Sequence, residues 1–194
     1  MIICYTHHYQ GSKGESHRLL ERAIAEYTGD KDRASCLVGS LKEVGEFGKP
    51  VIPDFDGFSI SHSRNTWAVI IAGPECGLDI QYPRAGRFRD TAERFYHPAD
   101  AASVAAQGEE EDASKEFFRL WTRREALIKA AGTSVAASDV PSVLESEPEY
   151  EGRRWVIREV TLPGEPDLSA AVCVPSGAID EHDSIEYIDI NNDR

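Results

Sequence analysis

The sequence has no long apolar run: its 194 residues contain no stretch of about 18 hydrophobic residues, so we expect no membrane-spanning helix and no membrane partner. The first residues, MIICYTHHYQ, show no basic leader followed by an apolar stretch, so no secretory signal is expected. None of the four cysteines forms a C-x-x-C pair, which argues against a zinc ribbon or a redox motif. We therefore expect buried free thiols and a cytoplasmic protein.

Several catalytic signatures are also missing. The sequence contains no G-x-S-x-G elbow, no P-loop, no G-x-G-x-x-G and no H-E-x-x-H. A serine nucleophile within the chain is therefore not indicated. If the protein is an enzyme, the attacking group is expected to come from a substrate.

Positive charge is scarce, and the formal net charge is -13. A chain of this charge repels polyanions on average, so no nucleic-acid partner is expected. Much of the acid lies at 108–116 and in the C-terminal tail, whereas the basic residues gather in two groups. These groups are Arg84, Arg87, Arg89 and Arg94, and Arg119, Arg123, Arg124 and Lys129. A local anion site therefore stays open.

The patterns predict alternating strands and helices. The 41% hydrophobic content suffices for one domain or for two small halves that share a core. A strand at 2–5 precedes a helix at 15–29 that ends at Gly29, and the proline- and glycine-rich segment 46–57 is expected to be an extended loop. Runs at 65–72 and 76–82 predict strands, which either form a hairpin or meet at a chain crossover.

The second part of the chain is predicted to be richer in helix. Residues 87–107 indicate helix broken near His97 and Pro98, and an acidic linker at 108–116 offers Asp112 or Ser114 as an N-cap for the following helix, which ends at Gly132. Closing strands are predicted at 153–160, 168–174 and 184–190. The order strand then helix occurs twice, at 2–28 and 77–107, so we place the boundary between an N-terminal half, 1–75, and a C-terminal half, 76–194, near Gly73 to Cys76.

Three oxygen-bearing side chains form a candidate metal site. Strand alternation puts Asp79 and Gln81 on one face, about 7 Å apart, opposite Leu78 and Ile80. With Glu125 from the later helix they are a ligand set that suits Mg²⁺. Two ordinary alternatives stay open: a solvated aspartate at a strand edge, and a helix-stabilising ion pair between Glu125 and Lys129, four residues later.

The segment SISHS surrounds His62 with hydroxyl groups. Such a cluster, preceded by a loop that contains Lys49, would bind phosphate. The alternative is a loop whose serines bond their own backbone. His7 and His8 are given no role.

Four blocks in order, GKPVIPD, FSISHS, GLDIQ and FFRLWTRREALIKAAG, resemble the 4'-phosphopantetheinyl transferases, in particular the larger Sfp-type branch. That family shows a G-K-P loop, then F-N-I-S-H-S, G-I-D-I-E and W-[ST]-x-K-E-[AS]-x-x-K at similar spacings. The likeness covers residues 45 to 133, and the first 44 residues match poorly and look shortened. The resemblance implies an α+β fold of two pseudo-symmetric halves with the active site in the cleft between them.

The resemblance also implies the reaction. Coenzyme A would donate its 4'-phosphopantetheine arm to a serine of an apo acyl or peptidyl carrier protein, releasing 3',5'-bisphosphoadenosine, and a monomer is expected. Asp79, Gln81 and Glu125 match the family's Mg²⁺ ligands, Glu125 also matches the group that helps deprotonate the serine, and Lys129 matches the lysine on the reacting phosphate. Trp121 would pack this helix into the cleft wall.

The remaining family positions concern the nucleotide. Lys49 with Pro50, and Ser61 with His62, match positions that grip the nucleotide and its phosphates, and Arg18 or Lys13 are candidates for the 3'-phosphate. Gln81 stands where the Sfp-type branch has Glu, and Arg124 replaces a Lys. Two alternatives are kept: a paralogue that binds coenzyme A or the carrier without turnover, and a metal-dependent phosphohydrolase.

Overall fold

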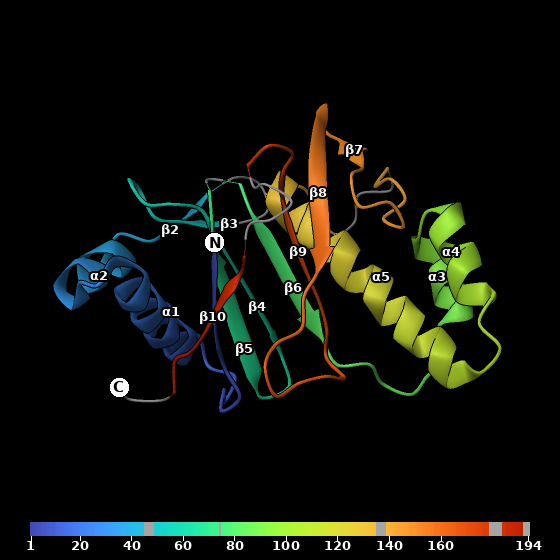
Figure 1. The fold of residues 1–194 in the computed structure, drawn as a ribbon, viewed down its shortest axis with the longest axis horizontal. Helices are drawn as coiled ribbons and strands as arrows, with labels where there is room; N and C mark the ends of the chain where they lie inside the picture. The colour runs from blue at the N-terminus through green and yellow to red at the C-terminus, as the bar shows by residue number, and fades with distance from the viewer. Residues whose placement is uncertain (45–48, 74, 135–138, 179–183, 192–194) are drawn as a thin grey trace.

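The protein consists of two halves, each a β-sheet with helices on its outer face (Figure 1). The computed structural model describes residues 1–44, 49–73, 75–134, 139–178 and 184–191. From one end to the other, the layers are α1 with α2, the first sheet, the second sheet, and α5 with α3 and α4. No helix in these ranges combines the length and the apolar character that crossing a membrane requires.

The first sheet has the order β10-β1-β5-β4. Its elements are β1 (Ile2–Thr6), α1 (Lys13–Thr28), α2 (Lys31–Gly39), β4 (Phe58–Ser63), β5 (Thr66–Ile71) and β10 (Glu186–Asp189). The predicted end of α1 at Gly29 is confirmed, since this residue adopts a left-handed φ of 70°. Helix α2 was not predicted, because it is short and buries only Ala34.

The second sheet has the order β6-β9-β8-β7. Its elements are β6 (Gly77–Gln81), α3 (Arg89–Phe95), α4 (Pro98–Ala105), α5 (Glu110–Ala131), β7 (Glu149–Tyr150), β8 (Arg153–Glu159) and β9 (Ser169–Pro175). The predicted break between α3 and α4 is confirmed: the His97 side chain caps α4, whose first residue is Pro98.

The two halves share one topology, which confirms the predicted α+β class with two similar halves. In each, a strand is followed by helices and then by two further strands, and the last of these pairs with the first: β1-β5-β4 repeats as β6-β9-β8. β5 and β6 lie in different sheets, so the chain crosses over between them and they do not form a hairpin. The final strand, β10, returns to pair with β1 in parallel. The division into domains at residue 75 stays a prediction.

Two local predictions were wrong. The expected loop at 46–57 contains β3 (Lys49–Val51), which pairs with β2 (Lys42–Val44), and residues 46–48 lie outside the described ranges. Pro50 is tolerated because a two-stranded ribbon has free edges. Residues 110–116 of the expected acidic linker are instead the start of α5, whose first turn carries three acidic residues that its dipole favours. The N-cap of this helix is Glu109, and not Asp112 or Ser114 as predicted.

Gly77 sets the distance between β6 and α5. A Cβ atom at this position would lie 1.9 Å from the backbone oxygen of Ala126 and 2.7 Å from the backbone nitrogen of Ala130. Only a glycine lets strand and helix backbones approach this closely. Since Asp79 lies two residues further along the same strand face, this contact also fixes its distance from α5.

We predict that Gly77→Ala destabilises the protein by about 1–3 kcal/mol or more, because both neighbouring atoms belong to a helix backbone. Urea unfolding measures the change. Gly39→Ala is the matched control, since nothing lies within 4 Å of its Cβ position. Equal stability of the two variants would contradict the close approach.

Candidate functional site

Three serines of β4 join the two halves. The backbone N–H groups of Leu78, Ile80 and Tyr82 donate to the hydroxyl oxygens of Ser59, Ser61 and Ser63 at 3.0, 3.2 and 3.1 Å, respectively. We call these three contacts the serine ladder. They satisfy the edge of β6 that β9 leaves free, so the reading of SISHS as a loop that bonds its own backbone is wrong.

The ladder also holds Asp79. Besides accepting from Ile80, the Ser61 hydroxyl donates to Asp79 Oδ1 at 2.8 Å. Asp79 is buried, 7% exposed, so the alternative of a solvated strand-edge aspartate is wrong. A buried carboxylate needs donors or a counter-ion, and Ser61 supplies one donor from the other half of the molecule.

Lys129 supplies the counter-ion. Its Nζ lies 2.8 Å from Asp79 Oδ1, 3.0 Å from the carbonyl oxygen of Leu78 and 3.4 Å from that of Ile60. The ammonium therefore contacts β6 and β4 at once, where the two halves meet. Its closest carboxylate is Asp79 on another element, so the expected ion pair with Glu125 within the helix is not the one observed.

Glu125 faces the same place with fewer partners. Its Oε1 is buried without a hydrogen-bond partner, and its one described ion pair is to Arg124 at 3.7 Å. Burial, with the charge of Asp79, raises the pKa of Glu125 to about 7, although Lys129 and Arg124 act in the opposite direction. Asp79 and Glu125, 46 positions apart in the chain, are thus brought within electrostatic reach of each other.

Lys49 reaches the same region from β3. Its Nζ donates to the carbonyl oxygen of Lys129 at 2.8 Å and reaches that of Ala130 at 3.5 Å, where α5 ends. These carbonyls have no partner within the helix, and a cation at a helix C-terminus is favourable. Burial lowers the pKa of Lys49. A residue expected on the nucleotide therefore also joins the two halves.

Other predicted site residues lie further apart. Gln81 is half-buried at the end of β6, and its amide donates to the carbonyl oxygen of Tyr82 at 3.4 Å. His62 is exposed, and its ring lies 5.2 Å from that of Tyr9, on the β4 face opposite Ser61. Pro50 is half-buried in β3, and Arg18 is exposed on α1.

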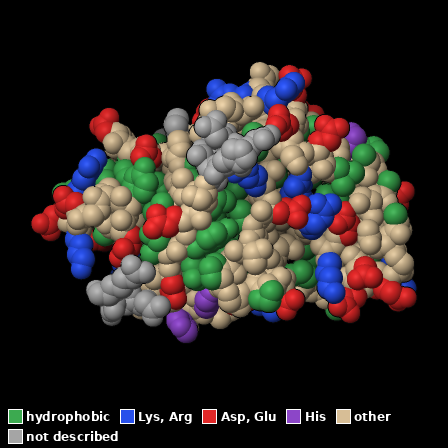
Figure 2. Space-filling view, in the orientation of Figure 1, with side chains coloured by type: hydrophobic (Ala, Val, Ile, Leu, Met, Phe, Trp, Pro, Cys, Tyr) green, Lys and Arg blue, Asp and Glu red, His purple; other side chains and the backbone are tan. Residues whose placement is uncertain are grey.

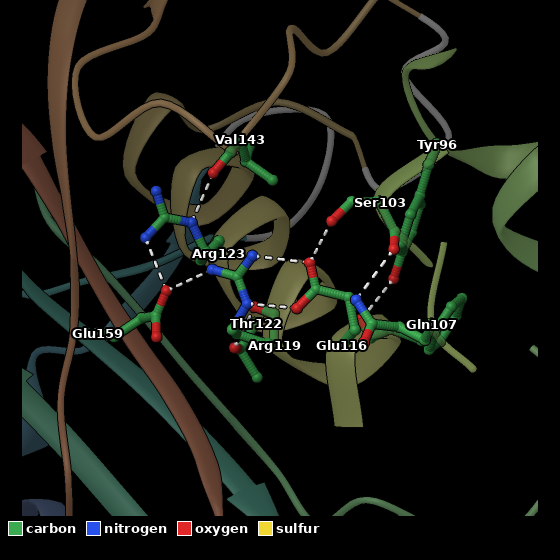
Figure 3. Close-up of polar contacts among 10 residues, drawn as sticks. Tyr96, Ser103, Gln107, Glu116, Arg119, Thr122, Arg123, Val143 and Glu159 are labelled. Carbon is green, nitrogen blue, oxygen red and sulfur yellow. Dashed lines mark hydrogen bonds and ion pairs between the residues drawn. The ribbon is translucent and has the colours of Figure 1, made fainter. Parts of the chain in front are cut away.

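The basic residues of α5 do not form one cluster. Figure 3 shows Arg119 and Arg123 converging on Glu159 of β8, at 2.7 and 3.0 Å, with Arg119 also bound to Glu116. Arg123 further donates to the carbonyl oxygen of Val143 at 2.5 Å. These two arginines are therefore occupied in tying α5 to the second sheet, while Lys129 points to β6.

Trp121 packs against aromatic side chains of the outer helical layer. Its ring stacks on Phe117 and lies 6.5 Å from Tyr96 of the α3–α4 corner, in the aromatic cluster between these helices and α5. Trp121 therefore helps to pack α5 against the outer helices, and the expectation that it packs this helix into the cleft wall stays a prediction.

A groove of about 1070 Å³ has Tyr82, Thr122 and Ser169 among its lining residues. Neither Asp79 nor Glu125 lines it. In the space-filling view, acidic and basic side chains are interleaved over α5, whereas hydrophobic side chains gather over the strands (Figure 2).

Sequence reasoning missed Ser59, Ser63 and Gly77. The signal for the serines was present: in FSISHS they alternate with Phe58, Ile60 and His62, so all three lie on one face of a strand. For Gly77 the sequence held no comparable signal, because the backbone that it contacts lies about 50 residues away in the chain.

The comparisons with known proteins address the same segment. A model of the 4'-phosphopantetheinyl transferase superfamily matches residues 75–171, from the crossover to β9. The chain is 31% identical over 153 residues to the 4'-phosphopantetheinyl transferase AcpT of Escherichia coli K12, which covers 76% of the chain and 73% of that protein. This chain belongs to the 4'-phosphopantetheinyl transferase superfamily.

Other members of the superfamily match over shorter stretches. The 4'-phosphopantetheinyl transferase of Bacillus subtilis is 32% identical over 95 residues, or 48% of this chain, and HetI of Nostoc is 31% identical over 96 residues, or 46%. The matched regions span 42% and 40% of those two proteins, about two fifths of their length. The matched superfamily segment contains Asp79, Glu125 and Lys129.

The residues at this site fit a hard divalent cation. Two buried carboxylates lie within electrostatic reach of each other, and Glu125 Oε1 has no hydrogen-bond partner within the described residues, as expected of an oxygen that a cation or a bound water would contact. No group of three His, Cys, Asp or Glu side chains suited to a metal occurs in the described ranges. A third ligand from the protein would therefore be an amide, as Gln81 offers, or a carbonyl.

The raised pKa of Glu125 predicts that the stability of the protein falls with rising pH. Its folded-state pKa, about 7, lies above the ordinary value of 4.5, so between these values the folded state binds more protons than the unfolded state. The free energy of unfolding should therefore fall as pH rises from 4.5 to 7 and lose nothing further from this group above that range. In metal-free protein with chelator, Glu125→Gln should be more stable than wild type by about 1–3 kcal/mol at pH 8.

Urea unfolding at pH 4.5 and pH 8 measures this difference, which should nearly vanish at the lower pH. Glu147→Gln, at an exposed position, is the control and should follow wild type at both values. A Glu125→Gln variant with the same relative stability at both pH values would show that Glu125 titrates normally.

Proposed function

We propose that this protein transfers the 4'-phosphopantetheine arm of coenzyme A to a serine of an apo carrier protein and releases 3',5'-bisphosphoadenosine. One observation carries the proposal: within the segment that matches the superfamily, Asp79, Glu125 and Lys129 converge where the two halves meet. Carboxylates that can hold a cation, together with a lysine, suit the stabilisation of charge that develops in a phosphoryl-type transfer.

Magnesium is the cofactor we propose for this site. Asp79 and Glu125 would hold it, and Gln81, on the same face of β6, would add its amide oxygen or leave that position to water. When bound, the ion would neutralise the charge of the coenzyme A diphosphate. Support comes from the unpartnered oxygen of Glu125 and from its proximity to Asp79.

Two side chains of the protein would take part in the transfer step itself. The serine oxygen of the carrier would form a bond to the phosphorus of the arm as the bond from that phosphorus to the oxygen of bisphosphoadenosine breaks. Glu125 would accept the serine proton directly or through water. Lys129 would stabilise the charge that develops on the phosphoryl oxygens.

The nucleotide is proposed to bind at the N-terminal half. Lys49 and Pro50 on β3 and Ser61 and His62 on β4 are the proposed contacts, with Arg18 on α1 for the 3'-phosphate. Ser61 and His62 project from opposite faces of β4, so each would contact a different part of the ligand. Exposed His62 and Arg18 are available to solvent-borne phosphate, whereas Ser61 already bonds Asp79.

The finer assignment is the Sfp-type branch, with holo-acyl-carrier-protein synthase activity. It is supported by two halves of like topology within a single chain and by the relative from Bacillus subtilis. A chain that binds coenzyme A or a carrier without turnover is the second candidate. It is favoured by Gln81, which leaves the site with two carboxylates.

A labelling assay tests the proposal. Incubation with coenzyme A, Mg²⁺ and a panel of apo carriers should add the mass of the phosphopantetheine arm to at least one carrier. Asp79→Ala and Glu125→Ala should each lower the rate about 100-fold or more, because each removes a charge that the transition state needs. Exposed Glu147→Ala should retain the wild-type rate.

The outcomes separate the candidates. Binding of coenzyme A without any labelled carrier would favour the binding-only paralogue. Release of bisphosphoadenosine without a carrier would favour a hydrolase. Near-normal labelling by the Asp79→Ala and Glu125→Ala variants would contradict the proposed roles of these residues.

Gln81→Glu is predicted to tighten Mg²⁺ binding in the presence of coenzyme A, because a charged ligand replaces a neutral one. Titration of labelling rate against Mg²⁺ concentration measures the effect as a lower half-saturation value. Glu149→Gln, an exposed change elsewhere, serves as the control. An unchanged Mg²⁺ titration would show that position 81 does not bind the ion.

A further inference from the structure

The ammonium of Lys129 sits among oxygen atoms. It contacts a carboxylate oxygen of Asp79 and the carbonyl oxygens of Leu78 and Ile60, all within 3.4 Å. Carboxylate and carbonyl oxygens are also the atoms that a hard divalent cation selects. Asp79 Oδ1 is therefore already in contact with a cation, which the protein itself provides.

A divalent ion that binds Asp79 Oδ1 would compete with this ammonium. Two positive charges that share one carboxylate oxygen would repel strongly in a buried site. The lysine is the partner able to move: its side chain is 31% exposed on a flexible stem, whereas that of Asp79 is 10% exposed and fixed by Ser61. Glu125, whose Oε1 has no hydrogen-bond partner and lies 3.7 Å from the Arg124 guanidinium, would remain to receive the ion.

We propose that Lys129 is the built-in counter-ion of the carboxylate pair in the metal-free protein, and that a divalent cation binds only as this ammonium leaves Asp79. This inference rests on the proposed function, since it assumes that Asp79 binds the metal. The displaced ammonium needs a new anion, and the coenzyme A diphosphate is the anion at hand. Metal and coenzyme A should therefore bind with positive coupling. The metal frees the Lys129 ammonium to contact the diphosphate, and the diphosphate supplies the anion that the displaced ammonium needs.

The proposal predicts that Lys129→Met changes the binding of metal and of coenzyme A in opposite directions. Loss of a residue that only supports the site would weaken every ligand. Loss of a competing cation should instead tighten metal binding while weakening coenzyme A, which loses its lysine contact. The expected sign of the effect therefore differs between the two ligands.

The experiment is Mn²⁺ titration followed by electron paramagnetic resonance, without coenzyme A, on wild type, Lys129→Met and Lys115→Met. Lys115 lies on the same helix, is exposed, and pairs with Glu111 at 2.7 Å, so its variant matches the change in net charge. Lys129→Met should bind Mn²⁺ about fivefold to tenfold more tightly than wild type, within the usual range of coupling between sites. Lys115→Met should stay within about twofold.

Equal or weaker Mn²⁺ binding by Lys129→Met would overturn the proposal. If wild type still labels a carrier, the proposed function survives and only the cation exchange fails. If neither wild type nor Lys129→Met binds Mn²⁺ and no carrier is labelled, both fail.

A second measurement uses the wild-type protein, so it does not depend on whether a variant folds. In wild type carrying ¹⁵N-lysine, the Nζ signal of Lys129, which is bonded in the metal-free protein, should change when diamagnetic Mg²⁺ is added. The signal of Lys49, whose ammonium bonds carbonyls at the end of α5, should not change. A Lys129 signal that stays constant while Mg²⁺ binds would overturn the proposal independently.

Discussion

The carboxylate of Asp79 is buried where β4 of one half meets β6 of the other, and the site depends on how that charge is held. Ser61 donates to it from the first half, and Lys129 donates to it from α5 of the second. A buried charge is tolerated only with such partners. The two halves must therefore be assembled before the carboxylate is in place, and the site exists only in the joined structure.

Joining is achieved largely by polar contacts at the edges of the sheets and by apolar contacts between their faces. The serine ladder satisfies the free N–H groups of β6, and Lys49 satisfies carbonyls at the end of α5. Behind them, Ile3 and Ile70 of the first sheet share a core with Leu78 and Val172 of the second. Several residues thus serve both the fold and the site, which makes their functional and structural roles hard to separate by deletion alone.

Glu125, unlike these residues, has few polar partners. Its Oε1 is buried without a hydrogen-bond partner, and its pKa is raised by burial and by Asp79. A buried carboxyl with so few partners lowers the stability of the protein and is a candidate for a functional contact. By contrast, Arg119 and Arg123 are fully engaged with Glu159 and backbone carbonyls, so the basic character of α5 serves mainly to attach the helix to its sheet.

The sequence by itself determined the α+β class, most strands and helix ends, and the local faces: alternation placed Asp79 and Gln81 together, and helical spacing placed Glu125 and Lys129 one turn apart. The four sequence blocks also indicated the family through their resemblance to its motifs. Only the tertiary structure decided that Lys129 bonds Asp79, that Ser61 does the same, and that β10 returns to β1. Periodicity fixes which way a side chain points, but the partner it meets comes from a distant segment, and that depends on how the two sheets pack.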